Sequence, residues 1–159
     1  MTFRRLAVLA MIPAVLLGLA VAPAPADAAV VSWQTLQVDI NKWTNYQRAK
    51  HNCAPLRTDS RLVRASRNHS AWMARTGSFG HTGAGGSSFV ARERAAGYTA
   101  PLSENIAWGY RSGADVVNAW MRSPGHRANI LNCRARAVGV GAVYSANGTP
   151  YYTQDFGSR

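Results

Sequence analysis

The spacing of apolar residues changes near residue 137, and this change limits the folds that the chain can adopt. Upstream, apolar residues recur every three or four positions, as they do on one face of a helix. From residue 137 onward they recur every second position, and Asn147–Gly148, the strongest short signal for a hairpin turn, interrupts the segment. We therefore predict antiparallel strands at 137–144 and 150–156. Helices followed by strands, without strand–helix–strand alternation, favour an α+β fold.

Capping residues divide the upstream region into separate helices. Ser32 precedes a predicted helix at 33–50, and Asp59 precedes a second helix that Gly77 ends. The other expected elements are an extended connection at 53–58, a short helix within 88–98 opened by Ser87 or Ser88 and ended by Gly97, a short strand at 101–110, and a helix at 112–121.

The first 28 residues have the pattern of a secretory signal peptide. Two arginines precede an apolar run at 6–21, and Ala26 and Ala28 have the small-x-small spacing that signal peptidase recognises. The run is shorter than the roughly 20 apolar residues of a membrane-spanning helix. We predict cleavage after Ala28, a single domain at 29–159 and secretion from the cell, with an uncleaved anchor as the alternative.

The chain carries 18 Lys and Arg against 7 Asp and Glu, a formal net charge of +11. Cleavage after Ala28 removes Arg4, Arg5 and Asp27 and lowers this charge to +10. An Arg-rich surface of this kind suggests an anionic partner, such as a cell-wall polymer or a membrane surface. The alternative is that the arginines are ordinary solvated residues, since no run of five basic residues occurs. We expect a monomer without sequence-specific nucleic-acid binding.

The two cysteines, Cys53 and Cys133, are expected to form one disulfide, because an even cysteine count in an exported chain indicates pairing. The bridge closes a loop of 80 residues, which is worth about 4–5 kcal/mol in the chain-entropy model. Neither cysteine lies in a CxxC motif, which argues against a thiolate metal site or a redox site.

Two of the four histidines are candidates for a functional site. His51 lies at a helix end and is expected to be exposed, and His69 lies on the apolar face of the second helix, where a hydrogen-bonded core residue is more common than a ligand. His81 and His126 lie beside glycines, where a side chain can project from a fixed backbone into a cleft. We expect Pro124 to form a rigid turn that carries His126.

Glu104 lies within "SENIAWG", next to otherwise uncharged residues of a predicted strand. If His81 and His126 converge with it, they could bind a divalent cation such as zinc, or act as an acid–base pair. Their wide spacing does not show convergence. Trp108 and Tyr110 are the expected groove residues. The chain lacks the HExxH and GxSxG motifs of metalloproteases and serine hydrolases.

Several ordered motifs resemble the bacterial branch of the CAP superfamily, which includes cysteine-rich secretory proteins, antigen 5 and pathogenesis-related proteins. They are "HT" at His81, "SENIAWG" at 103–109, "AWMRSPGHRANIL" at 119–131, then "GVG" and "YYTQDFG". The resemblance covers about residues 36–157. It implies a three-layer α–β–α sandwich with a small antiparallel sheet, and an extracellular location.

The cleft of that family collects two histidines and two acidic residues. His81, Glu104 and His126 match three of them, whereas the fourth position is Ser123 here, and Asp115 on the same helix is a poor substitute.

The resemblance implies a ligand cleft at His81, Glu104, His126 and Trp108 that binds a lipid, a small molecule or a peptide, or else a divalent metal held by His81 and His126. One alternative is a metal-assisted hydrolase in which Glu104 takes a proton from metal-bound water. Another is a wall-associated interaction protein that uses its Arg-rich surface.

Overall fold

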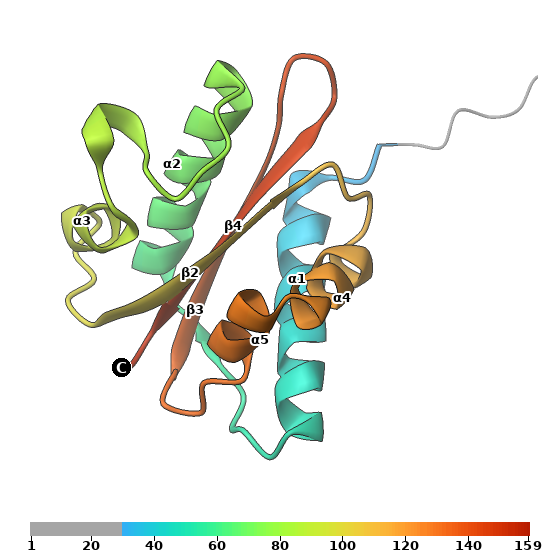
Figure 1. Ribbon diagram of the computed structural model, residues 1–159, viewed down its shortest axis with the longest axis vertical. Coiled ribbons are helices and arrows are strands. Elements are labelled where there is room, and N and C mark those ends of the chain that lie inside the picture. The colour runs from blue at the N-terminus through green and yellow to red at the C-terminus, as the bar shows by residue number, and fades with distance from the viewer. Residues whose placement is uncertain (1–29) are drawn as a thin grey trace, which may run out of the picture.

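The computed structural model describes residues 30–159, so the predicted signal peptide and its cleavage point lie outside the described residues. A four-stranded sheet separates two helical layers, which confirms the α–β–α sandwich (Figure 1). Helices α2 (Ser60–Thr76) and α3 (Phe89–Ala95) cover one face of the sheet. Helices α1 (Trp33–Lys50), α4 (Gly113–Arg122) and α5 (Pro124–Ile130) cover the other face.

The sheet has the strand order β1-β3-β4-β2. The predicted hairpin is confirmed as β3 (Ala137–Tyr144) and β4 (Pro150–Gly157), and β2 (Pro101–Trp108) pairs antiparallel with β4 at the edge. The expected all-antiparallel sheet needs one correction. Within the extended connection, β1 (Arg57–Thr58) pairs in parallel with the start of β3, which makes the sheet mixed.

The predicted helix starts agree with the structure because the capping signals are local. Ser32 accepts a hydrogen bond from Thr35 N, and Asp59 accepts one from Arg61 N. Gly77 ends α2 in the left-handed conformation, with φ of 71°. Of the two serines considered for α3, Ser88 is the cap.

The segment after α4 differs from its prediction. Pro124 does not form a rigid turn but begins a further helix, α5. Proline is tolerated in the first turn of a helix because the N–H that it lacks would have no intrahelical partner there. Ser123 serves as the last cap of α4 and the first cap of α5, so the two helices follow each other without a loop. His126 is therefore held on a helix.

The main apolar core lies on the side of the sheet that α1 covers, and a disulfide lies on the same side. Trp120 on α4 is buried and donates from Nε1 to the Ile106 carbonyl at 3.0 Å. Cys53 and Cys133 form the predicted disulfide. Beside it the fully buried Arg48 donates hydrogen bonds to four backbone carbonyls: Ala54, Ile130, Asn132 and Ala135. None of the helices in residues 30–159 is long and apolar enough to cross a membrane.

Candidate functional site

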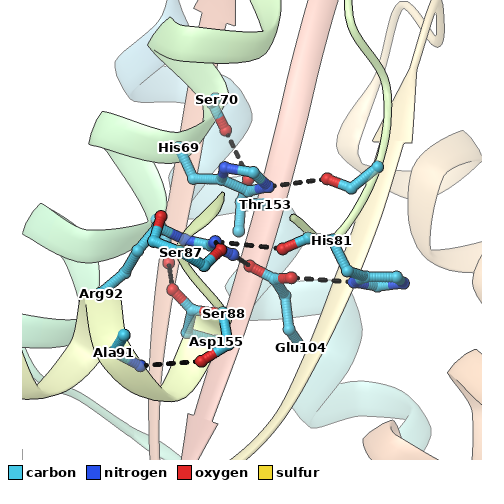
Figure 2. Close-up of polar contacts among 12 residues, drawn as sticks. His69, Ser70, His81, Ser87, Ser88, Ala91, Arg92, Glu104, Thr153 and Asp155 are labelled. Carbon is cyan, nitrogen blue, oxygen red and sulfur yellow. Dashed lines mark hydrogen bonds and ion pairs between the residues drawn. The ribbon is translucent and has the colours of Figure 1, made fainter. Parts of the chain in front are cut away.

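The structure brings His81 and Glu104 together at the edge strand. Glu104 projects from β2 with its side chain only 1% exposed, whereas the His81 side chain is 56% exposed. His81 Nδ1 donates to Glu104 Oε1 at 2.8 Å, and Arg92 of α3 donates from Nη2 to Glu104 Oε2 at 2.5 Å (Figure 2). One carboxylate thus orients the imidazole and is compensated by a guanidinium. Within residues 30–159, the Nε2 of His81 has no hydrogen-bond partner.

The loop that carries His81 is fixed by two further side chains. Arg92 Nη1 donates to the carbonyls of His81 at 3.0 Å and Ser87 at 2.7 Å. His69 of α2 donates from Nε2 to the Gly80 carbonyl at 2.9 Å, so it is the hydrogen-bonded core residue that the sequence indicated. Burial, followed by the charge of Arg92, lowers the pKa of His69. His69 therefore remains neutral and acts as a positioning residue for the loop.

Three carboxyl groups lie in this region, and two of them were missed from the sequence. Asp155 on β4 is the cross-strand partner of Glu104, and Glu93 lies on α3 next to Arg92. The three carboxyl residues are all buried. Burial, reinforced by Asp155 and Glu104, raises the pKa of Glu93 to about 9. Burial and the neighbouring Glu104 also raise the pKa of Asp155, which accepts a hydrogen bond from Ser66. A charged residue inside the alternating segment 150–156 was the one sequence signal that pointed to Asp155.

Glu93→Gln is expected to change the pH dependence of stability. The folded protein holds a proton on Glu93 that the unfolded chain releases above its ordinary pKa of 4.5. The free energy of unfolding should therefore fall as the pH rises from about 4.5 to about 9, by up to about 1.4 kcal/mol per pH unit from this group. Urea denaturation at about pH 5 and about pH 8 should show a shallower fall in Glu93→Gln, and the variant should be about 2 kcal/mol more stable than wild type at the higher pH.

The matched control for this experiment is Asp115→Asn, at an exposed carboxylate on α4. It should retain the wild-type slope. Asp155 contributes a slope of the same sign and remains in both variants. Identical slopes for Glu93→Gln and wild type would contradict the assignment.

His126 lies in a different hollow, which we call the aromatic groove. It has a volume of about 410 Å³. Its lining includes Phe79, Trp108, Tyr110, Trp120, Ser123 and His126. Trp108 is 54% exposed, with its ring 6.4 Å from that of Phe79 and 6.5 Å from that of Tyr151 between centroids. Burial, with a smaller contribution from His81, lowers the pKa of His126, so its imidazole is neutral at pH 7.

The predicted site residues thus divide between two neighbouring hollows. His81 and Glu104 line a hollow of about 320 Å³ together with Asn129 of α5, whereas Trp108 and His126 line the aromatic groove. Asn129 donates to Asn105 Oδ1 at 2.8 Å and to the Glu104 carbonyl at 3.2 Å, which ties α5 to β2. These amide contacts fix the position of α5, which carries His126, relative to β2, which carries Glu104.

Ser123 and Asp115, the two residues considered for the fourth position of the site, lie in different places. Ser123 lines the aromatic groove, where it supplies a hydroxyl. Asp115 caps the start of α4 with Ser112, whose hydroxyl donates to Asp115 Oδ2 at 2.7 Å. Within residues 30–159, no group of three or more His, Cys, Asp and Glu side chains is arranged to hold a metal ion.

Comparison with known proteins places this geometry in context. The family model for the cysteine-rich secretory protein (CAP) family matches residues 43–156. The uncharacterized protein YkwD of Bacillus subtilis is 37% identical over 114 residues, which are 71% of this chain and 43% of that protein. A Bacillus anthracis extracellular protein containing an SCP domain superposes with a TM-score of 0.73 at 29% identity, over 79% of this chain and 41% of that chain.

A third similar protein is an outer surface protein from Borrelia burgdorferi, with a TM-score of 0.68 at 21% identity, over 76% of this chain and 90% of that chain. At this identity the likeness shows the fold alone. The chain spans less than half the length of the two Bacillus proteins.

Proposed function

Because the chain belongs to the cysteine-rich secretory protein (CAP) family, we propose that it acts outside the cell as a ligand-binding domain whose aromatic groove receives a small apolar molecule carrying one hydroxyl group. The extracellular assignment is supported by the Cys53–Cys133 disulfide, since disulfides persist in oxidising compartments. The similar Bacillus anthracis protein is described as extracellular, which agrees with it.

The observation that supports this proposal is the combination of aromatic walls with the imidazole of His126. Ligand sites are mostly apolar cavities of roughly 300–1,000 Å³ with a few placed polar groups, and the groove falls within this range. Phe79 and Trp108 are exposed although they are large and apolar, so a ligand that covers them removes apolar surface from water. Neutral His126 offers a ring nitrogen that can accept a hydrogen bond from the ligand.

Naphthalene and 2-naphthol form a matched probe pair, because they differ by one hydroxyl group. Wild type is expected to bind 2-naphthol about fivefold more tightly than naphthalene, the gain of one hydrogen bond of about 1 kcal/mol. His126→Ala should remove this preference, and Trp108→Ala should weaken both probes about tenfold or more through lost stacking and apolar contact. Tryptophan fluorescence or calorimetry measures each affinity.

Tyr46→Ala is the control, because Tyr46 is an aromatic residue of α1 that is 50% exposed and does not line the groove. It should bind both probes as wild type does. Unchanged affinity of both probes for a Trp108→Ala/His126→Ala variant would contradict the proposed groove. Titration of His81→Ala/His126→Ala with zinc chloride decides the metal-dependent alternative, which requires zinc binding in wild type and its loss in this variant.

A further inference from the structure

The negative charges of the described chain lie mainly inside it. Of the six Asp and Glu residues in 30–159, four are buried. They are Asp59, Glu93, Glu104 and Asp155. Glu93 also holds a proton because burial raises its pKa to about 9. The outer surface therefore has almost no carboxylate to offset its cations.

The positive charges have the opposite distribution. Fourteen of the sixteen Arg and Lys side chains in residues 30–159 are exposed; the two others are Arg48 and Arg92. Exposed cations therefore outnumber exposed carboxylates by more than the net charge of the chain indicates. This imbalance favours association with polyanions.

Four arginines are concentrated on the outer face of α2. Arg61, Arg64, Arg67 and Arg75 are all exposed, and at 100° per residue they fall within a sector of about 120°. The buried residues of α2, such as Leu62, lie on the opposite side and face the sheet. At 1.5 Å per residue, the row extends about 21 Å along the helix. We call these four residues the α2 arginine row.

Three members of the row keep their charge available, and two of them are held in place. Asp59 forms ion pairs with Arg61 and with Arg57. In the described part of the chain, Arg64, Arg67 and Arg75 form no ion pair. Arg64 donates to the Ala96 carbonyl, and the Arg67 guanidinium lies 3.9 Å from the centroid of the Trp33 ring. Fixed guanidinium groups lose less conformational entropy when they bind a ligand.

The surface beside the row is hollowed. Arg64, Arg67 and Asn68 line a hollow of about 460 Å³ that reaches Val143 at the end of β3. The outer face of α2 carries Asn68 and arginines but no exposed large apolar side chain, whereas Phe79 and Trp108 lie at the aromatic groove. Insertion into a bilayer requires apolar side chains among the cations. A hollow edged by guanidinium groups, beside a row of arginines that follows the helix, fits an extended anionic chain instead.

We propose that the α2 arginine row docks a flexible phosphodiester polymer of the poly(glycerol phosphate) type. The polymer backbone lies in the hollow, where the guanidinium groups of Arg64 and Arg67 contact its phosphates, and Arg75 contacts a phosphate further along the helix. This function is independent of the aromatic groove. It would retain the secreted domain on a phosphate-rich surface while the groove remains open to ligand.

The test measures binding of the folded domain to synthetic poly(glycerol phosphate) by calorimetry at several salt concentrations. Arg64→Gln/Arg67→Gln/Arg75→Gln is expected to lose at least about tenfold in affinity, and the slope of log affinity against log salt should become shallower by about 2. Glutamine preserves helix propensity, and thermal unfolding checks that the variant is folded. If the triple variant does not fold, Arg64→Gln/Arg75→Gln serves in its place.

The control is Arg111→Gln/Arg122→Gln/Arg127→Gln, which removes the same three charges from exposed positions in the α4–α5 part of the chain. It should lose less than about threefold. Vesicles of phosphatidylglycerol present the same phosphodiester chemistry as a bilayer, and wild type should bind them more weakly than the polymer. Equal weakening by the two triple variants would show that net charge alone is responsible and would overturn the proposal, as would binding of wild type to vesicles but not to polymer.

Discussion

Gly139→Ala is expected to destabilise the domain by about 3 kcal/mol or more, because α2 lies directly on the backbone of β3 at this position. A Cβ atom at residue 139 would lie 2.1 Å from the carbonyl carbon of Leu62 and 2.3 Å from the nitrogen of Val63. These are backbone atoms in the first turns of α2, so no side-chain rotation can make room. Urea denaturation of the purified variant measures the loss.

Gly125→Ala is the matched control, because a Cβ at residue 125 has no atom within 4 Å. Gly125 lies in α5, where alanine has the higher helix propensity, so this variant should be as stable as wild type or slightly more stable. If Gly139→Ala unfolds at the same urea concentration as wild type, then α2 does not pack on β3 as closely as the structure shows.

The close approach of α2 to β3 also matters for the site. The same helix presents Ser66 to Asp155 at 2.8 Å and His69 to the Gly80 carbonyl at 2.9 Å. A displacement of α2 would therefore loosen the loop that carries His81. Helix α2 therefore connects the packing at Gly139 of β3 with the position of the His81 imidazole.

Features of the fold that depend on neighbouring residues were predictable from the sequence. Ser32, Asp59 and Gly77 act on the helix that each one bounds, and Asn147–Gly148 acts on its own hairpin. Helix α5 was missed because Pro124 ends one helix and can equally begin the next. Strand β1 was missed because its two residues are defined only by pairing with a strand about 80 positions later.

Of the candidate site, the sequence indicated which side chains to compare but not their surroundings. From the sequence, Glu104 could either pair with a histidine or cap backbone donors, and the structure shows the pair with His81 at 2.8 Å. The separation of His126 into the aromatic groove depends on the placement of α5 against β2, which no local signal reports. Arg92 was missed because nothing in a short helical sequence shows that its guanidinium reaches a carboxylate on another strand.

Arg92→Met is expected to lower the free energy of unfolding by about 3–5 kcal/mol, the usual cost of removing one member of a buried ion pair. The Glu104 side chain is 1% exposed and that of Arg92 11% exposed, so water cannot replace the lost guanidinium. The substitution also removes the donors to the carbonyls of His81 and Ser87. Urea denaturation gives the energy, and amide hydrogen exchange should show faster opening of residues 79–87.

A double-mutant cycle separates the buried charge from the lost packing. In a Glu104→Gln background no carboxylate at residue 104 needs compensation, so Arg92→Met should then cost only about 1–2 kcal/mol. The difference between the two costs is the coupling between the guanidinium and the carboxylate. If Arg92→Met costs the same in both backgrounds, Arg92 supports the loop through its backbone contacts alone. A coupling of about 2 kcal/mol or more would instead establish that the Arg92 guanidinium stabilises the buried Glu104 carboxylate, which orients His81.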